Sequence, residues 1–287
     1  MGRLHLAPHG AGVARGTRPP ASVEVIGLQR MALGGRWRVE AMRSYARPVL
    51  LWFTRGSGRI TINGSTRGYG PHNAVFLPPE TTHGFDMLGR VLGFAVFLPA
   101  DPEIDWPEEP VHLRCREGQY QAELTALIEL LERAQGADDA HSPSELFHLS
   151  GLVAVWLQRR AAVDGLENPA AQPKAANRLA AAFTALVERN FRRSKGVADY
   201  AGELGVTPTH LSRACRNTSG RSALALLMDR RLYEARRLLR DTDLPIHTIA
   251  KETGFGSAAY FSRAFRSEVG TSPSEFRHAK GGGMQRF

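Results

Sequence analysis

The chain has 287 residues, of which 43% are hydrophobic and 23% are charged, and its net charge is +9. This length and composition fit two globular domains and exclude a long disordered protein, and two cysteines without metal-ligand spacing exclude a disulfide framework and a zinc site. Charge-free apolar stretches such as residues 91–100 are too short to cross a bilayer, so we expect a cytoplasmic protein with no membrane partner.

The positive charge is concentrated in the C-terminal part of the chain. Residues 1–173 contain 17 Lys and Arg against 18 Asp and Glu, whereas residues 174–287 contain 20 against 10. A basic module beside a neutral one is typical of a polyanion-binding domain joined to a domain with another role. The charge alone would also be explained by binding to an anionic membrane surface, so the local sequence patterns must distinguish the two partners.

The N-terminal part has the pattern of a small β-barrel. Residues 1–20, rich in Gly, Pro, Ala and Arg, are predicted to be a loose segment before a domain at 21–163. Asn63-Gly64 fits a type I′ hairpin turn. Short apolar or alternating runs, separated by Gly and Pro, predict strands at residues 49–53, 59–62, 74–77 and 92–97. Many short strands with close turns favour an antiparallel barrel or jelly roll.

Two helices are predicted after the strands, at residues 118–134 and 144–160. The first carries apolar residues at steps of four, three and four, which form one seam: Tyr120, Leu124, Leu127 and Leu131. One interpretation is that this seam packs against the barrel, and the other is that it joins two copies of the chain as a homodimer. Residues 164–176, which contain two prolines and several alanines, are predicted to be the interdomain linker.

The remaining chain is predicted to be helical, with a domain at 177–280 and a tail at 281–287. Its predicted helices are residues 177–191, 197–204, 208–218, 222–240, 245–253, 258–269 and 274–278. Within them one unit occurs twice, at 197–216 and 246–266, and both copies contain Ser-Arg-Ala-x-Arg.

The repeated unit has the features of a helix-turn-helix. Ala201 and Ala250 are small where two helices cross, and Gly205 and Gly254 stand where the turn needs a positive φ. Apolar residues four apart turn one face of each second helix inward, which leaves polar residues outside to enter a major groove. The predicted DNA-contacting residues are Thr209, Ser212, Arg213 and Arg216 in the first copy and Ser257, Ala258, Ala259, Ser262, Arg263 and Arg266 in the second.

Residues 250–277 resemble the signature of the AraC/XylS family of bacterial transcriptional regulators. The matching residues are Gly254-Phe255, Tyr260 to Arg266, Gly270 and Ser272 to Arg277. The N-terminal part is similar, with weaker motifs, to the cupin-like effector domain of many members. The resemblance implies an α+β protein of two domains, namely a cupin-like β-barrel with helical appendage and an all-α DNA-binding domain. In the latter, the long helix at 222–240 would join two helix-turn-helix units.

The barrel lacks the residues of a catalytic cupin. A metal-binding cupin needs an early His-x-His pair, but residues 42–47 contain no histidine, so we predict no metal, no cofactor and no enzymatic activity. Trp52 and His83 are candidates to line an effector pocket, although core and loop roles explain them equally well.

These observations predict a sequence-specific transcriptional regulator that responds to a small-molecule effector of unknown identity. The expected partners are double-stranded DNA, a second copy of the chain and, by resemblance, RNA polymerase. Two alternatives stay open: a barrel enzyme with a DNA tether, which would hold a metal, and an architectural DNA protein, which would be indifferent to sequence.

Overall fold

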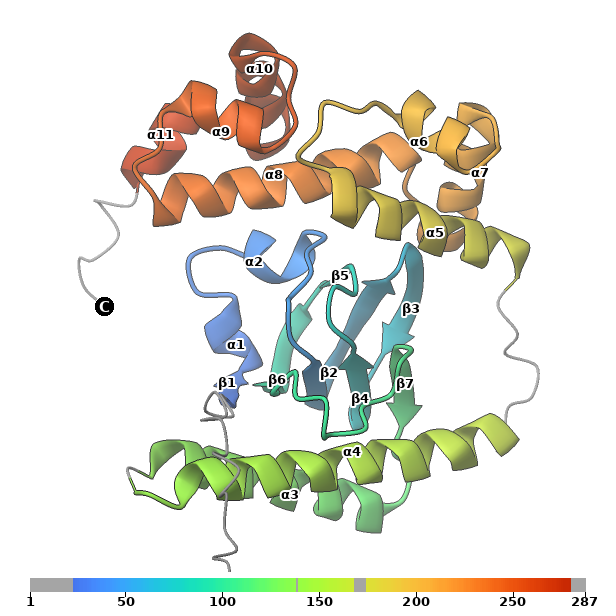
Figure 1. The fold of residues 1–287 in the computed structure, drawn as a ribbon, viewed down its shortest axis with the longest axis vertical. Helices are drawn as coiled ribbons and strands as arrows, with labels where there is room; N and C mark the ends of the chain where they lie inside the picture. The colour runs from blue at the N-terminus through green and yellow to red at the C-terminus, as the bar shows by residue number, and fades with distance from the viewer. Residues whose placement is uncertain (1–22, 138, 168–173, 280–287) are drawn as a thin grey trace, which may run out of the picture.

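A computed structural model describes residues 23–137, 139–167 and 174–279. The predicted loose segment at 1–20 and the tail at 281–287 lie outside these residues. The described chain forms a sheet domain followed by a helical domain, and helices α3 and α4 lie on the side of the sheets opposite the helical domain (Figure 1). None of the described helices is both long and apolar enough to cross a membrane.

The sheet domain is organised around one long strand, β2 (Val49–Ile62). All pairings are antiparallel, and the first sheet has the order β1-β6-β2-β4-β7. The other strands of that sheet are β1 (Glu24–Gly27), β4 (Asn73–Leu77), β6 (Leu88–Phe97) and β7 (Val111–Arg114). The second half of β2 pairs with β3 (Ser65–Tyr69) and β5 (His83–Phe85), which form the second sheet.

Two glycines allow β2 to pass from one sheet to the other. Gly56 has a φ of +85°, and a Cβ on Gly58 would lie within 2.4 Å of the Asp86 carbonyl oxygen. The pairing with β6 shifts register between Phe53 and Ser57. The predicted strands at 49–53 and 59–62 are therefore one bent strand, because a bulge interrupts the pairing but not the extended backbone.

The residues of β2 alternate between two apolar clusters. Leu51 and Phe53 are buried in a core between the two sheets, together with Tyr69 and Phe85. Trp52 is buried in the second cluster, on the opposite face of the first sheet and beneath the covering helices. Two short helices that the strand pattern did not predict, α1 (Leu28–Met31) and α2 (Trp37–Glu40), follow β1.

The outer face of the first sheet is covered by α3 (Gly118–Gly136) and α4 (Ser142–Glu167) (Figure 1). Leu124 and Leu131 of the predicted seam are completely buried in this chain's own core, whereas Tyr120 and Leu127 are only partly buried. The interpretation of packing against the sheet is thus correct for Leu124 and Leu131. A dimer seam through these two residues is wrong, because they have no surface left to offer a partner.

The helical domain begins with α5 (Ala175–Asn190). Its other helices are α6 (Val197–Glu203), α7 (Pro208–Ser219), α8 (Ala223–Asp241), α9 (Ile246–Glu252), α10 (Ala258–Val269) and α11 (Pro273–His278). Because α4 extends to Glu167 and α5 starts at Ala175, both reach into the predicted linker at 164–176, whose central residues 168–173 are outside the described chain.

The two domains touch at the β2–β3 turn and at α2. Asn63 and Gly64 both have positive φ, as the hairpin prediction requires. The Gly64 carbonyl oxygen accepts a 2.7 Å hydrogen bond from Thr218 Oγ1 at the end of α7. Beside α2, the Met42 N–H donates to Asp229 Oδ2 of α8 at 2.8 Å.

Candidate DNA interface

The first helix-turn-helix consists of α6 and α7. Ala201 is fully buried, as expected where the helices cross, and Gly205 has a φ of +66° at the turn. The Thr207 hydroxyl oxygen caps α7 by accepting the His210 N–H at 3.2 Å, and Pro208 occupies the first helical position. The turn chemistry read from the sequence is therefore confirmed.

The second unit, α9 and α10, repeats this construction. Ala250 is buried, Gly254 has a φ of +75°, and the Ser257 hydroxyl oxygen accepts the Tyr260 N–H at 3.2 Å. Phe255 is buried between the helices, with its ring centroid 5.1 Å from that of Phe261. The larger apolar residues give this unit a more aromatic core than the first.

Two buried arginines hold helix α8, which lies between the two units in the chain, against the start of the helical domain. Arg230 makes a bidentate ion pair with Glu188 of α5, at 2.6 and 2.8 Å, and lies over the ring of Phe191. Burial alone would lower the pKa of Arg230, but the interactions with Glu188 and the nearby Glu234 raise it. The guanidinium therefore remains charged, and the pair fixes α8 against α5.

Arg231 binds the segment between α5 and α6. It donates to the carbonyl oxygens of Phe191, Arg193 and Lys195, which follow α5, at 2.8–3.0 Å. These carbonyls lie beyond the end of α5, where helical partners are missing, and Arg231 supplies a donor to each of them. The Arg193 carbonyl oxygen also accepts the Lys195 N–H at 2.8 Å. Arg230 and Arg231 thus anchor α8 to α5 and to the segment that follows α5.

The predicted contact residues of α7 lie on its outer surface. Thr209, Arg213 and Arg216 are exposed, whereas Ser212 is half-buried. His210, which the sequence pattern did not single out, is exposed, and its Nδ1 lies 3.2 Å from Arg213 Nη2. Its position one turn before Arg213 on the same face was the available signal.

The outer surface of α10 carries fewer long polar side chains. Ala259, Arg263 and Arg266 are exposed and Ser257 is exposed at its N-terminus, while Ala258 and Ser262 are half-buried. Arg266 Nη2 lies 3.6 Å from Glu275 Oε2, an exposed pair of low strength. The residue that was missed here is Tyr260, whose side chain is 45% exposed and can offer a hydroxyl or a ring face.

Comparisons with known proteins agree with this geometry. Residues 200–279 match a family model described as a helix-turn-helix domain. The arabinose operon regulatory protein of Escherichia coli is 33% identical over 134 residues, which cover 47% of this chain and 44% of that protein. The arabinose operon regulatory protein of Salmonella typhimurium is 27% identical over 231 residues, 78% of this chain and 80% of that protein.

The C-terminal part of the chain thus matches a helix-turn-helix domain of the AraC type, and the chain as a whole is similar to AraC-family regulators. The chain is a sequence-specific DNA-binding transcriptional regulator, and its α+β, two-domain fold class is as predicted. Among solved structures, apo ToxT from Vibrio cholerae aligns over 91% of this chain and 97% of that chain, with 15% identity and a TM-score of 0.43.

The two residues predicted to line an effector pocket lie in different parts of the sheet domain. Trp52 is fully buried on the outer side of the first sheet, where its Nε1–H donates to Thr125 Oγ1 of α3 at 3.2 Å. His83 is buried beside Arg43 at the other end of the domain, where the two residues form an isolated β-bridge. The structure does not bring the pair together in one pocket.

His83 is held as a neutral imidazole. Burial, and then the neighbouring Arg43 guanidinium, lower its pKa to about 3. Its Nδ1 lies 2.9 Å from the Thr81 carbonyl oxygen. Among the described residues no cluster of three His, Cys, Asp or Glu side chains has the arrangement of a metal site.

Proposed function

We propose that this regulator reads two consecutive DNA segments through α7 and α10, acts as a cytoplasmic homodimer and responds to a small anionic or polar effector bound by its sheet domain. The observation that carries the DNA assignment is the pair of capped helices with exposed Arg213 and Arg263, fixed on one connecting helix. Relatives that are transcriptional regulators support a regulatory rather than an enzymatic role, in which RNA polymerase is a further partner.

The two recognition helices are proposed to contribute unequally. On α7, Thr209 and His210 are exposed beside Arg213, so several donors and acceptors can meet base edges. On α10, Ala258 and Ala259 offer only methyl contacts near Arg263, which favours thymine methyls and phosphates. The first segment of the DNA site should therefore be more strictly defined than the second.

Selection from a randomised duplex library tests this proposal. The wild-type chain should enrich a site with two segments about one helical turn, ~34 Å, apart. Arg213→Ala should relax the preference within the first segment, by about 1–3 kcal/mol at the contacted base. Arg263→Ala should weaken binding with a smaller change in preference, confined to the second segment.

Arg189→Ala, an exposed arginine on α5, serves as the matched control and should leave the selected site unchanged. A wild-type library without enrichment would contradict sequence-specific reading. Loss of preference in the same segment for both recognition-helix variants would contradict the assignment of one segment to each helix.

The homodimer is proposed to form through the exposed face of α3 and α4. An apolar groove of about 430 Å³ lies there, lined by Leu127, Leu130, Leu152 and Val155 among others. Leu152 is 54% exposed and Val155 is 42% exposed, which is unusual for large aliphatic side chains on one surface. The rim carries both Glu123 and Arg159, and charges of both signs suit a two-fold interface in which each copy presents the same patch.

The contact between the β2–β3 turn and α7 is the proposed link between effector and DNA. Thr218 closes α7 onto the Gly64 carbonyl, and Asn177 Nδ2 of α5 donates to Ser65 Oγ of β3 at 3.0 Å. An effector that binds better when these contacts are made, or better when they are broken, would shift the population of DNA-binding arrangements.

A further inference from the structure

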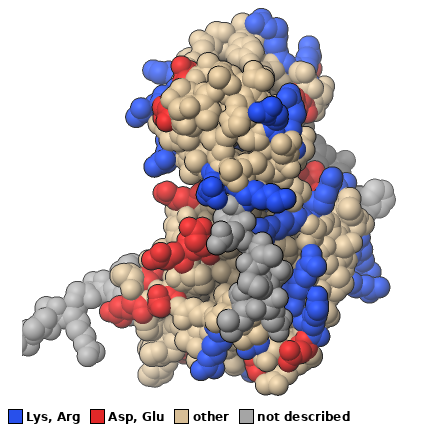
Figure 2. All heavy atoms as spheres, turned by 90° about the vertical axis from the view of Figure 1, so that its right-hand side faces the viewer, with Lys and Arg blue, Asp and Glu red and all other residues tan. Residues whose placement is uncertain are grey.

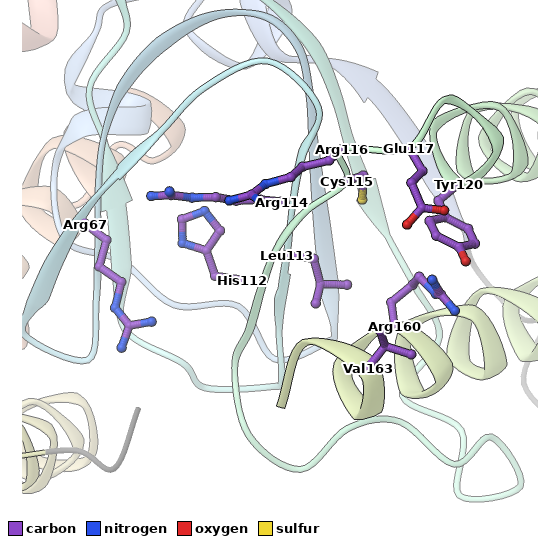
Figure 3. Close-up of a pocket in the computed structure, with 10 residues that line it drawn as sticks. All are labelled: Arg67, His112, Leu113, Arg114, Cys115, Arg116, Glu117, Tyr120, Arg160 and Val163. Carbon is purple, nitrogen blue, oxygen red and sulfur yellow. The ribbon is translucent and has the colours of Figure 1, made fainter. Parts of the chain in front are cut away.

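A basic basin opens where the free edges of the two sheets meet. It has a volume of about 820 Å³ and lies between β3, β7, the start of α3 and the end of α4. Figure 3 shows Arg67 on one side of the basin and His112, Arg114 and Arg116 on the other. The size is that of a small-molecule site rather than of a macromolecular surface.

Strand register explains why these side chains converge. Arg67 of β3 pairs with Ile60, and His112 of β7 pairs with Val75, and both of these partners are buried in the core between the sheets. Because side chains two apart share a face, Arg114 also lies on the inner side of β7. Basic residues thus occupy inward positions at the sheet edges, where apolar residues would be sufficient for folding.

Among the described residues, the positive charges in the basin have little acidic compensation. Within the described chain no ion pair is found for Arg67, Arg114 or Arg116, and Glu117 is the only acidic residue of the lining. Arg160 lies over the ring of Tyr120, with its guanidinium carbon 3.6 Å from the ring centroid. Several like charges around one concavity raise the local concentration of an anion.

The pKa of His112 is lowered by burial and by the neighbouring arginines. Burial, followed by the positive charges of Arg67 and Arg114, lowers its pKa to about 4. Its Nε2 lies 2.9 Å from Asn73 Oδ1, and Asn73 Nδ2 donates to the Pro71 carbonyl oxygen, so Nε2 carries the proton. The neutral imidazole leaves Nδ1 as an acceptor in a site whose other polar groups are donors.

We propose that this basin binds a small organic anion that carries two or more carboxylate or phosphate groups. Guanidinium groups match both oxyanions through paired hydrogen bonds, and the two flanks of the basin hold separate anionic groups. The N-terminal residues 1–22 contain no Asp or Glu, so that segment cannot supply the counter-charge. The proposal rests on the proposed effector function and specifies the class of effector.

The basin is directly connected to the DNA-binding domain. Arg67 is two residues from Ser65, which contacts α5, and three residues from Gly64, which contacts α7. An anion that draws Arg67 towards β7 therefore acts on β3, and the start of this strand contacts both α5 and α7. Lys and Arg side chains are visible on both lobes of the face shown in Figure 2. Because DNA could bind the same basic surface, binding of a small anion must be measured in the absence of DNA.

The test is calorimetric titration of the full chain with citrate and, in a second arm, with fructose 1,6-bisphosphate, at constant ionic strength and without DNA. At least one probe should bind saturably with one site per chain, and the better probe identifies carboxylate or phosphate as the preferred group. Arg67→Gln and Arg114→Gln should each weaken binding about tenfold or more, since each removes charged hydrogen bonds. Arg90→Gln, an exposed arginine on β6 outside the basin, should bind as wild type.

A local readout confirms the location. The ring signals of His112, assigned with a His112→Gln variant, should titrate at higher pH with the bound probe, because the anion cancels the charges that lower its pKa. Failure of both probes to bind, or equal loss of binding in Arg90→Gln, would overturn the proposal. In either case, if the same preparation still binds the DNA site selected from the library, the proposed DNA-binding function is unaffected.

Discussion

Single residues at the turns decide whether each helix-turn-helix can close. Gly205 and Gly254 occupy matching positions with nearly the same positive φ, but their surroundings differ. A Cβ on Gly205 would meet nothing within 4 Å, whereas one on Gly254 would lie 2.1 Å from the Phe191 carbonyl oxygen and 2.8 Å from that of Arg193. The second glycine is therefore required by packing as well as by backbone conformation.

We expect Gly254→Ala to destabilise the helical domain far more than Gly205→Ala. Both changes place an L-residue in the left-handed region, at a cost of about 1 kcal/mol. Gly254→Ala also forces apart the carbonyls held by Arg231, so its total loss should exceed about 3 kcal/mol. Urea unfolding followed by circular dichroism measures both losses, and equal losses would show that the close approach relaxes freely.

At the scale of elements, α3 and α4 have an inner face and an outer face with different roles. Leu124 is buried on the inner face of α3, while Leu127 and Leu152 border the exposed groove. The four-three-four spacing predicted the apolar character of the seam, but it could not assign each residue to the sheet or to a partner. Both neighbours favour apolar side chains, so the sequence pattern is the same for either.

Leu127→Asp combined with Leu152→Asp should give a folded monomer, because the charges fall on the proposed dimer face and leave the core intact. Leu124→Asp should instead unfold the sheet domain, since it buries an unpaired carboxylate. Sedimentation velocity and circular dichroism distinguish these outcomes. A wild-type chain that is already monomeric, or a double variant that stays dimeric, would contradict an interface at this groove.

At the scale of the whole molecule, the basic half carries its own core. The cluster of the first helix-turn-helix includes only one residue from the sheet domain, Met42, and that of the second includes partly buried Trp37 of α2. The remaining members of both clusters come from α5 to α11 and the turns between them. We therefore expect the predicted linker at 164–176 to separate two nearly complete apolar cores.

A fragment of residues 174–287 should fold and bind duplex DNA without the sheet domain. Its 20 basic against 10 acidic residues predict an affinity that falls steeply with salt, as phosphate contacts release counterions. Fluorescence anisotropy over a salt series provides the measurement, with circular dichroism as the folding control. A folded fragment whose binding is absent or insensitive to salt would contradict this prediction.

The sequence by itself determined the DNA-binding half of this protein. Positive-φ glycines, caps such as Thr207 and Ser257, and apolar residues four apart act within one or two helical turns, so their effect is visible in the order of residues. The bend of β2, the two short helices before it and the strand at β7 escaped detection, because long-range pairing and packing impose them. Only the tertiary structure could place Trp52 and Leu124 together in the core between the first sheet and its covering helices. Only the tertiary structure could bring Arg67 and Arg114 to the same basin. These two arginines lie on strands that are paired with different partners, and the basin between them exists because both sheets end at the same side of the fold.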